Sequence, residues 1–153
     1  MYMILEISHS CERVSADPKI SNTESAMPEK KNVVVIGLDP FLIDFSKPGY
    51  PPGMTADKVM AGINACEKEL TDLGYNVRMC MTDFGETAEA VVREVLNQTQ
   101  SDCVMIGAGV RTVPANFILF EKLVNVVHEH APRARMCFNN LPSDITAAVK
   151  RWT

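Results

Sequence analysis

Apolar residues in this chain fall into short unbroken runs, separated by longer stretches in which apolar positions recur at helical spacing. Runs without alternation are typical of strands that are covered by helices on both faces. Two such runs predict strands at Val33–Ile36 and Cys103–Ile106, and two more apolar stretches, each with one arginine inside it, predict strands at Val77–Met81 and Ala134–Phe138. Because a helical stretch follows every strand and no hairpin signal joins two strands, we expect right-handed β-α-β connections and a parallel sheet.

The helical stretches begin at recognisable start signals. Thr55 is a good N-cap in front of an apolar stripe, and Asp83 and Glu86 have the spacing of a capping box. Prolines stand at the starts of the last two helices, at Pro114 and Pro142, where a missing N–H costs no hydrogen bond. Each strand is therefore followed by its own helix, and helices are expected on both faces of the sheet.

The helix predicted over residues 115–130 is the most apolar of the four. Its sequence, ANFILFEKLVNVVHEH, carries Ile118, Leu119 and Val126 in addition to the stripe that one contact with a sheet requires. Surplus apolar surface on one helix is typical of an interface. We therefore expect a homodimer that buries one or more of these side chains.

The expected fold is α/β, a three-layer α/β/α domain over residues 32–153. The commonest arrangement of a small sheet of this kind is the flavodoxin-like order 2-1-3-4. A chain of 153 residues, 46% of them hydrophobic, can bury one core and has little room for two. A single domain follows.

Residues 1–31 are expected to form a disordered or weakly ordered extension. The stretch SHSCERVSADPKISNTESAMPEKK has no apolar period and would bury little surface if it were ordered. Met1–Ile7 is apolar, and pairing along a sheet edge would make it a fifth parallel strand. The sequence from Met27, MPEKKNVVVIG, has the form of an ordinary cytosolic start, which fits an upstream extension that adds nothing to the fold.

The net charge limits the kinds of partner that this protein is expected to bind, and its cysteine usage indicates the compartment. A net charge of −4 argues against a protein whose task is to coat nucleic acid or an anionic membrane, although it leaves room for a local anion pocket. The 5 cysteines form no C-x-x-C pair, and those at 80, 103 and 137 fall in or beside apolar strands. Reduced, buried thiols and a cytoplasmic location are expected.

The stretch SDCVMIGAGVRTVPA, residues 101–115, carries the clearest sign of a ligand site. The predicted strand ends at Gly107 and Gly109, which free the backbone to turn, and Arg111 adds a fixed positive charge before the helix start at Pro114. A strand end that leads into a helix N-terminus is where an open parallel sheet holds a ligand. We therefore expect a small anionic ligand on this turn.

Two polar residues at other strand ends are expected beside that ligand. In the order 2-1-3-4, Asp39 flanks the point where the strand order reverses, and Asn139 ends the fourth strand. The connection Phe41–Met54 is long, rich in proline and glycine, and partly aromatic, which favours a lid that folds back onto the domain. The structural alternative is that Arg111 pairs with Asp39 and only fastens the strand ends.

Four segments, VVVIGLDP, GETAEAVV, SDCVMIGAGVRTVP and FEKLVNVVHEHAP, resemble a group of small stand-alone bacterial α/β proteins of uncharacterised function. The resemblance covers Asn32–Trp152 and leaves out the residues before it. It implies a flavodoxin-like or Rossmann-like domain, and it implies no activity.

The signatures of better-known α/β proteins are missing. A receiver domain needs a phosphorylatable aspartate at the end of its third strand, where this chain has GAG, and GAGVRT lacks the third glycine of a dinucleotide-binding turn. A Walker A loop and a G-x-S-x-G elbow are absent. His128 and His130 are two apart on a helix and cannot hold a metal together, so no metal site is predicted and no cofactor can be named.

Two functions remain open at this point. One is a small-molecule-binding or catalytic domain, with an anionic ligand on the Gly107–Arg111 turn and Phe41–Met54 as its lid. The other is a non-catalytic, receiver-like interaction module that associates through the helix over residues 115–130. No Ser-His, Cys-His or paired-carboxylate arrangement distinguishes an enzyme from a binding protein here.

Overall fold

Four parallel strands form one sheet in the order β2-β1-β3-β4, as predicted. The computed structural model describes residues 28–153. Its strands are β1 (Asn32–Leu38), β2 (Asn76–Thr82), β3 (Cys103–Ile106) and β4 (Arg135–Phe138). β1 is central and pairs with β2 on one side and β3 on the other. The predictions for residues 1–27, an extension and a fifth strand at Met1–Ile7, lie outside the described residues.

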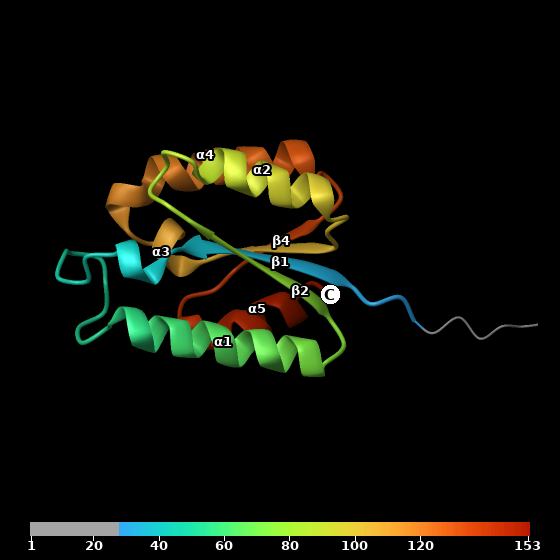
Figure 1. Ribbon diagram of the computed structural model, residues 1–153, viewed down its shortest axis with the longest axis horizontal. Coiled ribbons are helices and arrows are strands. Elements are labelled where there is room, and N and C mark those ends of the chain that lie inside the picture. Colours follow the sequence, from blue (N-terminus) through green and yellow to red (C-terminus); the bar gives the residue numbers. More distant parts are fainter. Residues whose placement is uncertain (1–27) are drawn as a thin grey trace, which may run out of the picture.

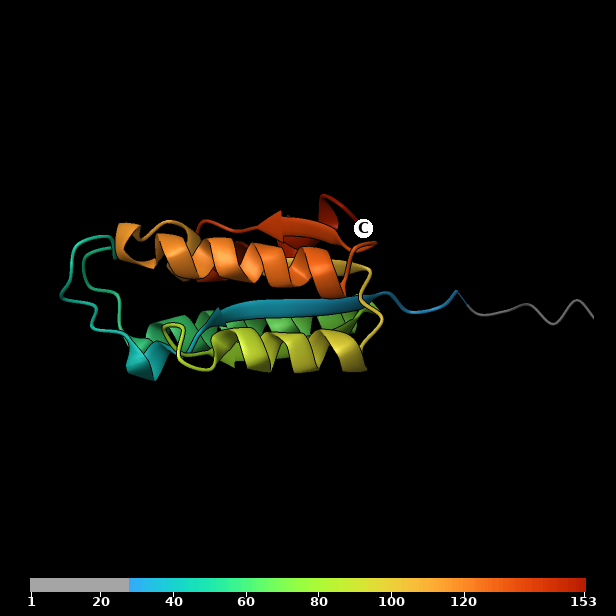
Figure 2. The same ribbon diagram turned by 90° about the horizontal axis from the view of Figure 1, so that it is seen from above.

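Helices cover both faces of this sheet and complete three layers (Figure 1). α1 (Ala56–Asp72) and α5 (Ile145–Lys150) lie below the sheet in that view, and α2 (Ala88–Gln98) and α4 (Phe117–His130) lie above it. From above, α2 and α4 run side by side along the sheet (Figure 2). The remaining short helices are η1 (Pro40–Leu42), α3 (Ala108–Arg111), η2 (Pro114–Asn116) and η3 (Pro142–Asp144).

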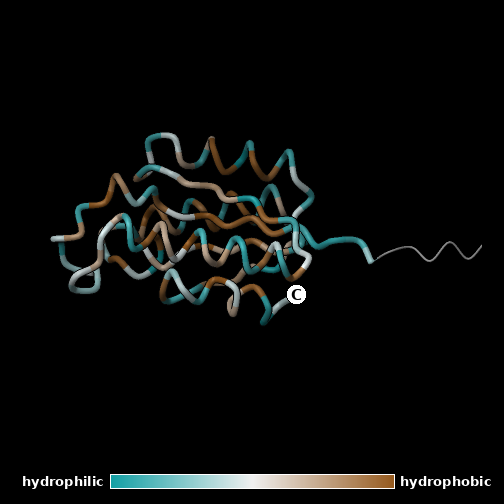
Figure 3. Tube along the Cα trace, turned by 60° about the horizontal axis from the view of Figure 1, so that its bottom comes forward, coloured by the Kyte–Doolittle hydropathy of each residue, from teal (hydrophilic) through white to brown (hydrophobic). Residues whose placement is uncertain are grey.

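The two faces of β1 supply two separate halves of the core. Val34, Ile36 and Leu38 pack with α2 and α4, whereas Val33 and Val35 pack with α1 and α5. Brown, apolar segments accordingly run along the central strands in Figure 3. Because each successive side chain of the strand meets a covered face, the whole run VVVI is apolar, and this explains why the lack of alternation predicted β1 correctly.

The helix starts agree with the sequence at α1 and differ from it at α2. The hydroxyl of Thr55 accepts a hydrogen bond from the Lys58 amide at 3.3 Å, as an N-cap does. α2 begins only at Ala88, five residues after Asp83, so the capping-box prediction places the start of this helix too early. A separate turn joins Asp83 to Ala88.

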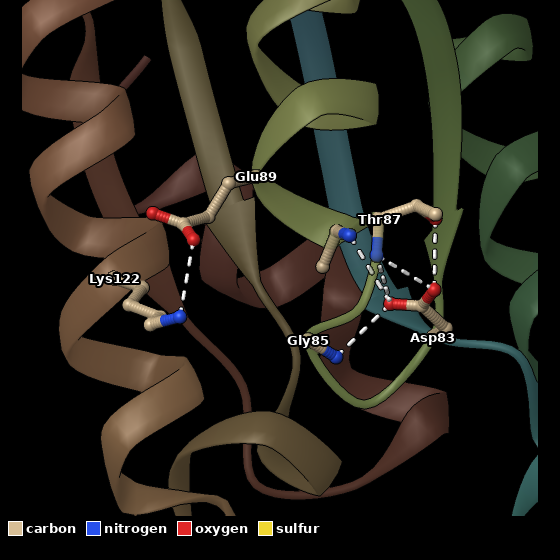
Figure 4. A network of polar contacts seen from close by, with 6 residues as sticks. Asp83, Gly85, Thr87, Glu89 and Lys122 are labelled. Atoms are coloured by element: carbon tan, nitrogen blue, oxygen red, sulfur yellow. Dashed lines mark hydrogen bonds and ion pairs between the residues drawn. The ribbon is translucent and has the colours of Figure 1, made fainter.

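Asp83 organises that turn through its carboxylate (Figure 4). Oδ1 accepts from the amides of Gly85 at 3.0 Å and Ala88 at 3.1 Å, and Oδ2 accepts from the Thr87 amide at 2.9 Å and hydroxyl at 2.8 Å. These hydrogen bonds, led by the one from Gly85, lower the pKa of Asp83 below its ordinary 3.8. The carboxylate therefore joins the end of β2 to the start of α2.

We expect Asp83→Asn to lower the melting temperature near neutral pH and to flatten its dependence on acid pH. A carboxyl whose pKa is lower in the folded state stabilises that state above its ordinary pKa, and the stabilisation disappears as the pH falls through the lowered value. The melting temperatures of variant and wild type should therefore converge between about pH 5 and about pH 2. A matched control is Glu89→Gln, because Glu89 makes an exposed 3.1 Å ion pair with Lys122 (Figure 4). A difference from wild type that stays constant with pH would contradict this role of Asp83.

Much of the apolar surface of α4 that we expected at a homodimer interface lies in the core instead. Leu119 and Val126 are only 5% and 4% exposed, because they pack into the core between α4, α2 and the sheet. Phe117 is the first residue of the helix and is 55% exposed, and Ile118 is 60% exposed. Only the start of α4 therefore has apolar side chains left for a partner.

The end of the chain lies beside the start of β1. The ammonium group of Lys31 donates to the backbone carbonyl of Thr153, whose hydroxyl is 2.7 Å from that of Tyr75. α5 ends at Lys150, and Trp152, two residues later, is 56% exposed. These contacts tie the last residues to the amino-terminal edge of the sheet.

Candidate functional site

A cavity of about 160 Å³ lies at the carboxyl-terminal edge of the sheet. Strand ends form its floor, α1 and α5 contribute side walls, and the loop over residues 43–54 covers it. That loop is the long connection at the left end of the sheet in Figure 1. The lining includes Val35, Gly37, Met81, Met105, Thr112, Asn139 and Asn140 at or beside the strand ends, and Phe45, Tyr50 and Met54 from the loop.

The loop folds back onto the domain, as its apolar residues predict. The rings of Phe45 and Tyr50 meet edge to face at 5.4 Å, and both line the cavity. Gly49 has a φ of 103°, a conformation that side chains other than glycine rarely adopt, and a Cβ there would lie 3.3 Å from Val113. The loop is therefore held close against the segment that precedes η2.

Most amide groups of the Gly107–Arg111 turn have partners within the protein. The Gly107 amide donates to the Ile36 carbonyl at 2.8 Å, and the Ala108 amide donates to Oδ1 of Asn139 at 2.7 Å. The amides of Val110 and Arg111 both donate to the Gly107 carbonyl, which closes the short helix α3. Gly107 and Gly109 line the cavity, and the amides of Gly107, Ala108, Val110 and Arg111 already have partners.

Arg111 fastens the end of β3 to the segment that follows β4. Its guanidinium donates to the Asn139 carbonyl at 2.8 Å and to Oδ1 of Asn140 at 2.9 Å, and it lies 5.9 Å above the ring of Phe138. Among the described residues its Nε is buried without a hydrogen-bond partner. Arg111 is not among the residues that line the cavity.

The other two predicted site residues also have structural partners. The carboxylate of Asp39 accepts from the Phe41 amide at 2.9 Å and caps η1, outside the lining of the cavity. Asn139 lines the cavity and is 4% exposed, and its Nδ2 donates to the Leu141 carbonyl at 2.7 Å while its Oδ1 holds Ala108. The structure thus brings Gly107, Gly109 and Asn139 together, and it leaves Asp39 and Arg111 behind that surface.

Charged side chains are absent from the lining of this cavity. Of the described residues around it, none is Asp, Glu, Lys, Arg or His, and Tyr50 is the only titratable one. The hydroxyl of Thr112 donates to the Ala108 carbonyl at 2.8 Å. The cavity can therefore enclose a ligand, but the residues lining it supply no nucleophile with a neighbouring base.

No family model and no curated protein matches this chain. Function has to be argued from the geometry itself. Within residues 28–153, no helix combines the length and the apolar character needed to cross a membrane. The same residues contain no group of three or more His, Cys, Asp or Glu side chains that could hold a metal ion.

The described cysteines are core residues, as predicted. Cys66, Cys80, Cys103 and Cys137 are all free thiols and buried. Burial raises the pKa of the Cys80 thiol, which keeps it in the unreactive protonated form. The sulfurs of Cys103 and Cys137 lie 3.5 Å apart on neighbouring strands, on the face of the sheet that α1 and α5 cover, and neither residue lines the cavity.

A second hollow of about 260 Å³ lies at the opposite edge of the sheet, near His130 and Arg133. His130 has partners within the protein there, since Nδ1 is 3.0 Å from Oδ1 of Asn97 and Nε2 accepts from Nε of Arg93 at 3.3 Å. These contacts join the C-terminus of α4 to α2. His130 therefore has the structural role that its place at a helix end suggested.

Sequence reasoning missed Gly37, which lines the cavity from the middle of the sheet. The residue belongs to the face of β1 that carries Val33 and Val35, so the run VVVIGL has one position without a side chain on that face. A glycine inside a strand often marks the close approach of a ligand. That signal was present in the sequence.

Proposed function

We propose that this protein binds a small molecule in the cavity at the carboxyl-terminal edge of the sheet, with the loop over residues 43–54 as the lid. The observation that carries the proposal is the position of the cavity. It lies at the ends of β1 and β3, and in the order β2-β1-β3-β4 the connections from these two strands leave in opposite directions. Open parallel sheets hold their ligands at this kind of reversal.

The sequence favoured an anionic ligand, and one feature of Arg111 supports that choice. The buried Nε of Arg111 has no partner within the described residues, so at least one N–H of this guanidinium is free to donate to an anion. To reach this Nε, an anion would have to pass Asn139 and Asn140, which already accept hydrogen bonds from Nη2 of Arg111. The experiment below includes anions for this reason.

The proposal predicts that some compound in a broad library of neutral and anionic metabolites raises the melting temperature of the protein. A ligand that binds only the folded state stabilises it, by about 2.7 kcal/mol at a free concentration of 100 Kd. The cavity is then tested with a matched pair of variants, Val35→Ala and Val34→Ala. Both residues are almost fully buried on β1, but only Val35 lines the cavity.

The shift produced by the compound should change in Val35→Ala and stay as in wild type in Val34→Ala. Both variants lose the same two methyl groups from the core, so a difference between them reports on the cavity rather than on stability. A library in which no compound raises the melting temperature would contradict the proposal. So would a shift that both variants preserve.

The interaction module remains the alternative, and the start of α4 favours it. Phe117 and Ile118 are 55% and 60% exposed and adjacent in the chain. A homodimer, if it forms through α4, has these two side chains to bury, because Leu119 and Val126 belong to the core. Sedimentation of the wild type and of Ile118→Glu tests whether the protein associates through these two side chains.

A further inference from the structure

We propose that the cavity binds one neutral aromatic ring, and that Gly37 makes the room for it. This inference rests on the proposed binding function and names its ligand class. Three observations carry it: the missing side chain at Gly37, the size of the cavity, and the chemistry of its walls.

Gly37 leaves a gap on the face of β1 that packs against α1 and α5. Val33 and Val35 point to that face, and the next residue on it is Gly37. A Cβ built there would have ordinary contacts only, with Cε of Met81 at 3.8 Å and its Sδ at 3.9 Å. The backbone of Gly37 does not need glycine, since its φ lies outside the positive range. Space for a ligand therefore explains this glycine better than backbone conformation does.

The size of the gap corresponds to one ring. The cavity measures about 160 Å³. An apolar protein cavity of about 150 Å³ is known to hold a benzene molecule, so a second fused ring would not fit without movement of the lid. The ligand, or the part of it that enters, is therefore monocyclic.

The walls are suited to an aromatic ring in particular. Three methionines line the cavity from different elements: Met54 in the loop, Met81 in β2 and Met105 in β3. Methionine sulfur makes favourable contacts with ring edges at about 5 Å, and its flexible side chain adapts to the ring that enters. Phe45 and Tyr50 add two aromatic surfaces from the lid.

The polar groups around the cavity favour a neutral ligand over a charged one. The amide of Asn139 uses both ends within the protein, and the hydroxyl of Thr112 donates to the Ala108 carbonyl. The guanidinium of Arg111 donates to the segment after β4 and lies outside the lining. A carboxylate in this space would lose its water without gaining a charged partner, which is strongly unfavourable.

The test uses the methionine methyl groups as reporters. The full-length protein, labelled with ¹³C at these methyls, is titrated separately with phenol, benzoate, cyclohexanol and inorganic phosphate. Phenol should shift the signals of Met54, Met81 and Met105 saturably, while Met60, Met79 and Met136, which do not line the cavity, serve as internal controls. Benzoate has the same ring with a charge, and cyclohexanol has a ring without aromaticity. Both should bind at least about tenfold more weakly than phenol.

Two variants then locate the ring. Gly37→Val fills the gap and should abolish the phenol-dependent shifts without lowering the melting temperature, because a Cβ at this position has only ordinary contacts, both with Met81. Val35→Ala enlarges the cavity and should raise the affinity for 2-naphthol relative to phenol. If Gly37→Val does not fold, Val35→Ala alone decides, since unchanged selectivity there would overturn the inference.

The outcomes separate this inference from the proposed function. Binding of benzoate or phosphate as tight as that of phenol, or of cyclohexanol as tight as phenol, overturns the aromatic and neutral assignment while leaving a binding site in place. Shifts that include Met60, Met79 and Met136 equally, or that do not saturate, also overturn it. If none of the four compounds moves the cavity methyls, the ring assignment is wrong, and the metabolite screen decides separately whether the protein binds a small molecule.

Discussion

Leu119→Glu is expected to unfold the domain, whereas Ile118→Glu is expected to leave it folded. The two residues are adjacent on α4, but Leu119 is 5% exposed within the core and Ile118 is 60% exposed. A glutamate at position 119 places an ionisable group among apolar side chains without a partner, and we expect a loss of at least about 4 kcal/mol. That is a large part of the roughly 5–15 kcal/mol that stabilises a typical domain.

Circular dichroism during heating measures the loss of stability, and sedimentation of the folded proteins measures whether they associate. A wild type that runs as a dimer and an Ile118→Glu variant that runs as a monomer would support association through the start of α4. If both are monomers at micromolar concentration, the homodimer prediction for this helix fails. A stable Leu119→Glu protein would instead show that α4 does not pack against α2 as described.

Arg111→Ala is expected to lower the free energy of unfolding by about 2–3 kcal/mol. The substitution removes a charged donor from the Asn139 carbonyl and from Oδ1 of Asn140, and it uncovers the ring of Phe138. Hydrogen bonds from a charged group contribute about 1.5–3 kcal/mol, and the Asn139 carbonyl would lose its guanidinium partner in a residue that is 4% exposed. The end of β4 should therefore loosen from α3.

Arg78→Ala is the matched control for this measurement. Arg78 also donates two hydrogen bonds, to Gln98 at 2.9 Å and to Thr99 at 3.5 Å, but it is exposed and its loss should change stability by less than about 0.5 kcal/mol. Urea denaturation compares the two variants. An Arg111→Ala protein as stable as wild type would mean that Arg111 is not needed for the fold, and the anionic ligand expected from the sequence would regain its support.

The fold was predictable because its main signals are local. Unbroken apolar runs separated by helical periods appear wherever a parallel sheet is covered on both faces, and the run from Val33 to Ile36 met this condition on both sides of β1. The strand order followed from the commonest arrangement of such units. The start of α2 was less predictable, because Asp83 can cap a helix directly or through an intervening turn, and its spacing to Glu86 does not distinguish them.

The position of the cavity could be anticipated from the sequence, but the chemistry of its walls could not. Glycines at the end of β3 indicated the edge of the sheet where the cavity lies, and Gly107, Gly109 and Asn139 all line it. The partners of Arg111 could not be predicted, because Asn140 reaches it only through the packing of β4 beside β3, 29 residues further along the chain. The expected strand order suggested Asp39 instead, whose carboxylate accepts a hydrogen bond from the nearby amide of Phe41.

The contact between Lys31 and Thr153 has a consequence for protein engineering. The start of β1 and Thr153 lie together at one edge of the sheet, at the opposite end from the loop over residues 43–54 (Figure 1). A segment whose two ends are neighbours can be placed within a surface loop of another protein through short linkers, without stretching either partner. Residues 31–153 are therefore suited to insertion into a reporter protein, whose fluorescence would report whether a compound changes the loop over residues 43–54.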